Sequence, residues 1–205
     1  MVKKLYVIAI LFGASCLLVP SAQAISLDFV PASQEVVVGT SVSVDIVISG
    51  LDLAGEIVSA FDLDVTYDST VLQATGVTFG TSLGDPFFFD VVEDSDTSTA
   101  GVVDFAALSF LSNLDLADLQ GDSVTLATLS FDSIGVGTSS LAFILNALND
   151  VKGLDPFIPL TLTTGTGSVT AVPEPGTILL FASGLGGLAG LRIWQKRKRP
   201  IHVVA

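Results

Sequence analysis

Carboxylates are the side chains in this sequence that could most readily take part in catalysis or binding. Residues 25–172 hold twenty Asp and Glu residues but one basic residue, Lys152, so this stretch carries a formal charge of −19. Two carboxylates at a set separation can hydrolyse glycosidic bonds, but abundant surface acids also form such pairs by chance. The same stretch has no cysteine, and the only histidine is His202, which removes Ser-His-Asp and Cys-His catalysis and Cys/His zinc sites. We therefore expect no enzymatic activity.

The charge excess has two interpretations. An acidic surface keeps an exported protein soluble, and it also favours partners that carry positive charge. Nucleic acids are excluded as partners, because an acidic domain repels their phosphates.

A run of acids after position 85 offers oxygen ligands of the kind that calcium prefers. The calcium candidates are Asp90, Glu93, Asp94 and Asp96. Their spacing does not match an EF-hand loop, and the segment EDSDTSTAG has the composition of a polar turn. We expect a solvated turn here and no cofactor, with calcium as the alternative.

Aromatic side chains are few in residues 25–172, which hold no tryptophan and one tyrosine, Tyr67. The run Phe87-Phe88-Phe89 belongs to an alternating stretch over 87–92 that predicts a strand. Alternation exposes either Phe88 or its two neighbours, so Phe88 is the candidate to face a ligand such as a polysaccharide. Packing in the core or within a loop is the more usual role of phenylalanine and the expected one.

Strands must position these side chains, because apolar residues alternate along most of the middle of the chain. In two segments every second residue is apolar. These residues are Phe61, Leu63, Val65 and Tyr67 in one segment and Val42, Val44, Ile46 and Ile48 in the other. The apolar phase changes near Leu126-Ala127, which predicts a bulge or a strand buried on both faces. One short helix is expected over 114–119, capped by Ser112 or Asn113, and residues 161–171 are expected to form the last strand. Turn signals between the runs predict an all-β, antiparallel sandwich.

The two ends of the chain differ from this acidic middle. Lys3 and Lys4 precede a short apolar run, and Ala22-Gln23-Ala24 follows it. This layout predicts a signal peptide over 1–24, read by the Sec export machinery and cleaved after Ala24, with an uncleaved anchor as the alternative. The rest then divides into one domain over 25–171 and a tail over 172–205.

The tail combines a short motif, an apolar glycine-rich run and a basic end. The motif is Val172, Pro173, Glu174, Pro175 and Gly176. A helix over about 177–194 rises roughly 27 Å, enough for a thin bilayer. The basic residues are Arg192, Lys196, Arg197, Lys198 and Arg199. They predict a stop signal that stays in the cytoplasm, with the acidic domain outside.

Two resemblances connect these observations to known families. The segments LDFVPASQEVVVGTSVSVDIVISG, IVSAFDLDVTYDSTVLQATGVTFG and GDSVTLATLSFDSIGVGTSSLAF resemble a cohesin-type domain of the superfamily that also contains carbohydrate-binding modules. The resemblance implies a jelly-roll β-sandwich of about nine strands. Cohesins of cellulosomes bind dockerin modules through one sheet face, but no motif here fixes contact residues.

The tail is similar to the PEP-CTERM sorting signal, because VPEPGT precedes a short glycine-rich span and a basic end. The similarity implies recognition of Pro173, Glu174 and Pro175 by an exosortase, a membrane-embedded transpeptidase of Gram-negative bacteria with exopolysaccharide loci. The protein would then reside briefly in the inner membrane and afterwards at the cell surface or in the extracellular matrix. A permanent anchor is the alternative. We expect an adhesion or assembly module, with a polysaccharide or a dockerin-bearing protein as alternative partners.

Overall fold

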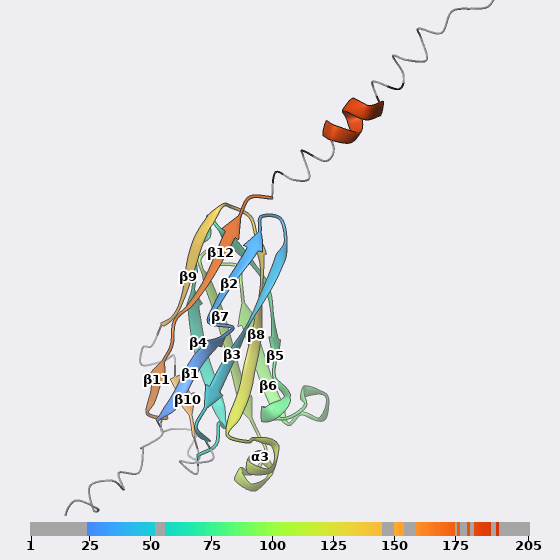
Figure 1. Ribbon diagram of the computed structural model, residues 1–205. Coiled ribbons are helices and arrows are strands. Elements are labelled where there is room, and N and C mark those ends of the chain that lie inside the picture. The colour runs from blue at the N-terminus through green and yellow to red at the C-terminus, as the bar shows by residue number, and fades with distance from the viewer. Residues whose placement is uncertain are drawn as a thin grey trace, which may run out of the picture.

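Two packed β-sheets make up the body of the protein in the computed structural model (Figure 1). The structure describes residues 24–51, 56–144, 150–153, 159–174, 176, 180, 183–189 and 192. The expected signal peptide up to position 23, with Ala22, lies outside the described residues. So do Pro175 and the basic residues 196–199.

The first sheet has five strands in the order β11-β1-β3-β8-β5. Their bounds are β11 (Leu162–Thr164), β1 (Ile25–Val30), β3 (Ser41–Ser49), β8 (Ser123–Ser133) and β5 (Leu72–Phe79). β1 and β11 run parallel, and the other neighbours are antiparallel.

The second sheet has seven strands, six of them in the order β2-β12-β9-β4-β7-β6. Their bounds are β2 (Ser33–Val37), β12 (Gly167–Val172), β9 (Gly137–Ile144), β4 (Ala60–Thr66), β7 (Val102–Ser109) and β6 (Val91–Asp96). The seventh, β10 (Asp150–Lys152), pairs with β4. β2 and β12 are parallel, and all other pairs in this sheet are antiparallel.

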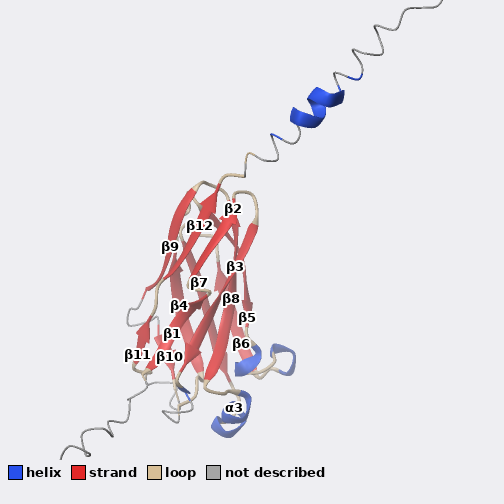
Figure 2. Cartoon of the chain, viewed as in Figure 1, coloured by secondary structure: helices blue, strands red, loops and turns tan. Residues whose placement is uncertain are grey.

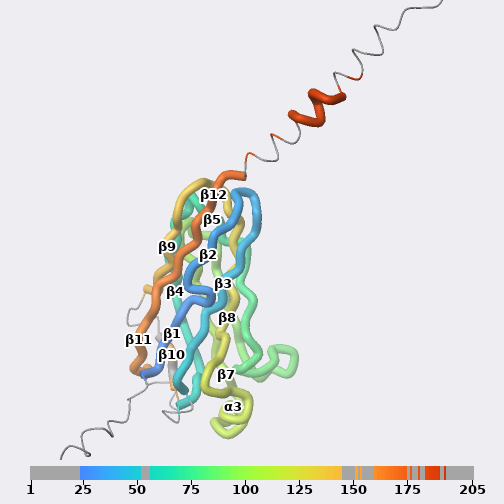
Figure 3. Tube along the Cα trace, in the orientation of Figure 1, coloured from blue at the N-terminus to red at the C-terminus, as the bar shows by residue number. Residues whose placement is uncertain are grey.

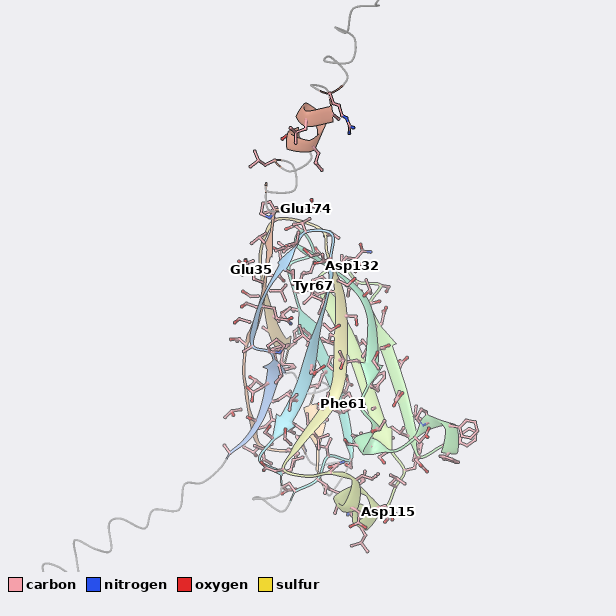
Figure 4. The ribbon with its side chains drawn as sticks, turned by 45° about the vertical axis from the view of Figure 1, so that its right-hand side comes forward. Glu35, Phe61, Tyr67, Asp115, Asp132 and Glu174 are labelled. Carbon is pink, nitrogen blue, oxygen red and sulfur yellow. The ribbon has the colours of Figure 1, made fainter. Side chains whose placement is uncertain are left out.

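Alternation along the strands places the core between the two sheets. Along β4 the predicted inward residues Phe61, Leu63 and Val65 are buried, and Tyr67 continues the pattern just after the strand. Aromatic rings pack across the interior, with centroids of Tyr67 and Phe131 5.2 Å apart in an edge-to-face arrangement. Figure 4 shows Phe61 and Tyr67 within the sandwich. The all-β sandwich predicted from the sequence is confirmed.

The described residues contain twelve strands, where about nine were expected. The predicted last strand over 161–171 is in fact two strands, β11 in the five-stranded sheet and β12 in the seven-stranded one. Gly165 lies between them, and a Cβ at this position would overlap the carboxylate of Asp28. The Gly165 N–H also donates to the Leu27 carbonyl oxygen at 2.8 Å, so this hydrogen bond holds the crossing against β1.

The bulge predicted near Leu126-Ala127 is confirmed. The register between β3 and β8 shifts between Ile46 and Val47, whose partners are Ala127 and Thr125, so Leu126 is the extra residue. The shift lets Leu126 and Ala127 both be buried, which accounts for the change of apolar phase in the sequence.

Three short helices gather at one end of the sandwich (Figure 2). These are η1 (Thr81–Leu83), η2 (Pro86–Phe88) and α3 (Asn113–Leu119). The Ser112 side chain accepts a hydrogen bond from the Asp115 N–H and caps α3, so the predicted helix and its cap are confirmed.

A buried glutamine fastens this helical end to the sheets. The Gln120 amide donates to the carbonyl oxygens of Val58 at 2.7 Å and Ser82 at 3.1 Å, and its Oε1 accepts from the Val58 N–H at 2.7 Å. These bonds join the end of α3 to the segment that enters β4 and to η1. The side chain therefore fixes the position of both helices.

The tail leaves the sandwich at the end opposite these helices. The tube in Figure 3 shows β12 running away from the helical end toward the tail. Figure 4 places Glu174 at one end of the molecule and Asp115 of α3 at the other. Residues 183–189 are helical, and half of the expected helix over 177–194 lies outside the described residues. Within the part that is described, no helix is long and apolar enough to cross a membrane.

Candidate binding surface

Aspartates from three neighbouring strands share the outward face of the seven-stranded sheet. The set, called the aspartate face below, consists of Asp62, Asp64, Asp94, Asp96 and Asp104. Asp104 on β7 lies directly opposite Asp64 on β4 and Asp96 on β6. Because directly opposite side chains of antiparallel strands lie about 5 Å apart at Cβ, three negative charges form one row across the sheet.

The electrostatics of the aspartate face reflect this crowding. Partial burial, together with the negative charges of the other four aspartates, raises the pKa of Asp104. The pKa of Asp96 is lowered instead, because Ser98 hydrogen bonds to its carboxylate, with the Ser98 N–H donating to Oδ1 at 2.7 Å. Like charges directly opposite each other destabilise a sheet, so this arrangement opposes folding.

Apolar side chains continue this face toward the helical end. Val92 on β6 lies directly opposite Leu108 on β7, and both are exposed. Phe110, which follows β7, is exposed as well, and its N–H donates to the Asp90 carbonyl oxygen at 2.7 Å. One outward surface therefore combines an acidic middle with an apolar end.

Three consecutive phenylalanines project beside this apolar end, and we call them the phenylalanine knob. Phe87, Phe88 and Phe89 are 80%, 67% and 85% exposed. The centroids of the Phe87 and Phe88 rings are 5.2 Å apart, and their planes are nearly perpendicular at 87°. The ligand candidate Phe88 is thus exposed together with both neighbours.

The predictions of a strand over 87–92 and of interior packing for this run are wrong. Asp85 caps η2 by accepting a hydrogen bond from the Phe87 N–H at 2.9 Å, and Pro86 occupies the first helical position. A cap followed by proline favours a helical turn over a strand. β6 consequently begins only at Val91, after the three rings have turned outward.

The loop that carries the knob is tied down on both sides. Before the knob, the Leu83 carbonyl oxygen accepts a hydrogen bond from the Ser109 hydroxyl at 2.6 Å, and after it the Asp90 carbonyl oxygen accepts one from the Phe110 N–H at 2.7 Å. Phe89 adopts a left-handed conformation with φ 63° and ψ 26°, which is unfavourable for a bulky residue. These bonds therefore fix the backbone that carries the exposed rings.

The calcium candidates do not converge in the structure. Residues 91–96 form β6, so the expected polar turn begins only after Asp96. The pleat places Glu93 on the opposite side of the strand from Asp94 and Asp96. Burial and the charge of Asp85 raise the pKa of Glu93. Among the described residues, no group of three or more acids, cysteines or histidines is arranged to hold a metal ion.

The sorting motif begins where the sandwich ends. Val172 is the last residue of β12, and Pro173, Glu174 and Gly176 follow as exposed residues. At the other end of the domain Ala24, the expected last residue of the signal peptide, is exposed just before β1. Arg192 is also exposed.

Two packed, mainly antiparallel sheets define a β-sandwich, and the aspartate face is its most densely charged row of directly opposite carboxylates. The chain belongs to the cohesin domain family, whose model matches residues 28–133, more than half of the 205 residues. Cohesin domains are non-catalytic binding modules. Residues 171–198 match the PEP-CTERM protein-sorting motif, which indicates an exported protein sorted to the cell surface.

Solved cohesins share this fold. A cohesin from Clostridium acetobutylicum is 20% identical, with a TM-score of 0.55, and the match covers 75% of this chain and 94% of that one. The sixth cohesin of scaffoldin B from Acetivibrio cellulolyticus, solved in complex with a mutant dockerin, is 18% identical with a TM-score of 0.55 and coverages of 73% and 100%. A type I cohesin from Pseudobacteroides cellulosolvens is 16% identical, with a TM-score of 0.54 and coverages of 74% and 94%. No curated protein matches the chain.

Proposed function

We propose that this protein is an exosortase-sorted surface or matrix protein whose cohesin module binds a protein partner of positive charge. The observation that carries the proposal is the aspartate face. Five like charges are held on one flat sheet face, although their repulsion opposes folding. Such a cost is expected where charged groups serve binding, because functional sites commonly reduce stability.

A dockerin-bearing protein is the first partner to consider, since the relative from Acetivibrio cellulolyticus was solved with a dockerin. Charge complementarity would speed association and select partners with exposed Lys and Arg. The polysaccharide alternative receives less support, because the perpendicular rings of Phe87 and Phe88 form no continuous flat surface for stacking on sugars.

Sorting is the second half of the proposal. The Sec machinery would export the chain, the apolar tail would hold it briefly in the inner membrane of a Gram-negative bacterium, and an exosortase would act at Pro173-Glu174-Pro175. Exposure of Pro173 and Glu174 directly after β12 supports this, because a processing enzyme needs access to the backbone. The acidic domain would remain outside the cell.

The test of binding uses the tethered domain over 25–172 and its Asp64→Asn/Asp96→Asn/Asp104→Asn variant. Both are incubated with the extracellular protein fraction of the source culture, and captured proteins are compared by quantitative mass spectrometry. We expect a protein that the wild type captures at low salt and that the variant, or 0.5 M salt, releases. Identical captured sets for wild type and variant would refute the proposed binding mode.

A further inference from the structure

The phenylalanine knob is an exposed apolar feature that the core does not need. Its three exposed rings belong to η2 and the residue that follows it, just before β6. Figure 2 shows short helices beside β6 at the end of the sandwich opposite the exit of the tail. Soluble proteins rarely expose adjacent large apolar side chains without a binding role. A left-handed Phe89 is a further sign, because backbone strain of this kind clusters at functional sites.

The charges around the knob limit what it can contact. Asp85 and Asp90 flank the three rings in the sequence. Burial and the negative charge of Asp85 raise the pKa of Glu93. Residues 25–172 have a formal charge of −19. Both a second copy of this domain and an anionic membrane would therefore be repelled at close approach.

The knob is continuous with the aspartate face. Val92 on β6 and Leu108 on β7 lie opposite each other. They separate the start of β6, where the knob ends, from Asp94, Asp96 and Asp104 farther along the two strands. A partner that covers Asp94 and Asp104 would therefore reach these two residues next, and the knob beyond them. An aromatic anchor beside complementary charges is the usual composition of a binding hot spot.

We propose that the phenylalanine knob inserts into an apolar pocket, bordered by Lys or Arg, on the same protein that binds the aspartate face. The inference rests on the proposed function and adds to it the chemistry of the partner's contact surface. The aspartates steer and orient the partner, while the phenylalanines supply the buried apolar area that slows its dissociation.

Site-specific crosslinking in the native organism tests this arrangement. The photoreactive residue p-benzoylphenylalanine replaces Phe88 in the knob, Ala106 in the aspartate face, or Ser43 on the outward side of β3 as the control. Crosslinked products are identified by mass spectrometry. We expect the positions of Phe88 and Ala106 to capture the same protein and the position of Ser43 not to capture it.

The captured protein is then purified and titrated against two variants of the domain over 25–172. Phe87→Ser/Phe88→Ser/Phe89→Gly should weaken Kd tenfold or more, mainly through faster dissociation, with little effect of salt. Asp64→Asn/Asp96→Asn/Asp104→Asn should slow association and weaken its salt dependence. Both variants alter exposed or half-buried side chains, and circular dichroism checks that they fold.

The outcomes separate the two proposals. If the aspartate variant loses binding while the knob variant binds like the wild type, the knob inference is wrong and the proposed function stands. If the aspartate variant binds like the wild type, the proposed function is wrong. Crosslinking of Phe88 to lipid, to glycan, to another copy of this chain, or to a different protein from that of Ala106 also overturns the inference.

Discussion

The charge row across the seven-stranded sheet predicts that removing one carboxylate stabilises the protein. Asp104 has Asp64 directly opposite, and side chains at this spacing place their charges about 6 Å apart. Coulomb's law in water then gives about 0.7 kcal/mol for this pair. Asp96 lies directly opposite on the other side, and Asp62 and Asp94 lie farther away, so Asp104→Asn should stabilise by about 1 kcal/mol or more at low salt. For a domain of this size, that corresponds to a rise in Tm of about 2–4 °C.

The pH dependence of this effect has a defined sign. The folded-state pKa of Asp104 is raised above its ordinary value of 3.8 by partial burial and by the neighbouring aspartates. The protonated, uncharged form of Asp104 avoids the repulsion, so the folded state has its full benefit below pH 3.8. This benefit is lost as the pH rises through the folded-state pKa and Asp104 becomes charged. The advantage of Asp104→Asn should consequently be present at pH 7 and disappear toward pH 3.8. It should also shrink in 1 M NaCl, where the screening length is about 3 Å.

Calorimetry of the wild type and the variant at several pH values measures this difference. Glu35→Gln is the matched control, because it removes one exposed carboxylate whose directly opposite residue is Thr170 on β12. The control should change Tm little at any pH. An Asp104→Asn protein that melts at or below the temperature of the control at pH 7 would refute the repulsion argument.

Four further predictions concern Gln120, Phe89, the tail and calcium. Gln120→Leu should destabilise by about 3 kcal/mol in urea unfolding, because it leaves the buried N–H and carbonyl of Val58 without their partner; a loss below 0.5 kcal/mol would contradict this. Phe89→Gly should keep or raise Tm, since glycine accepts the left-handed backbone, and a clear loss in calorimetry would show that the ring packs. The mature surface form should lack residues 177–205, and an intact mass that includes them would show a retained tail. Calcium and a chelator should give the same thermal midpoint, and a higher midpoint with calcium would reveal a site that the described residues do not form.

Local sequence patterns were sufficient for most strands because burial acts on one face at a time. Val42, Val44, Ile46 and Ile48 alternate with polar residues, and β3 buries all four. The bulge at Leu126 could be read from the change of phase. α3 could be read from its cap and from the acid in its first turn.

The same reasoning failed at the phenylalanines, where two local signals competed. Alternation from Phe87 to Val92 predicted a strand, but Asp85 and Pro86 start a helical turn first. The sequence contained both signals and no measure of their relative strength. The prediction of one strand over 161–171 failed for another reason. β11 pairs with β1 and β12 pairs with β9, and these partner strands are distant in the sequence.

The sequence by itself determined that the protein has an acidic β-sandwich and a sorting tail, and that residues 25–172 hold no histidine or cysteine for chemistry. These properties depend on composition and on residues that are close in the chain. Only the tertiary structure decided that Asp62 and Asp64 lie beside Asp94, Asp96 and Asp104, and that the phenylalanine knob is exposed near them. The physical reason is that strand order and register bring distant residues together, and neither is encoded in the period of a single strand.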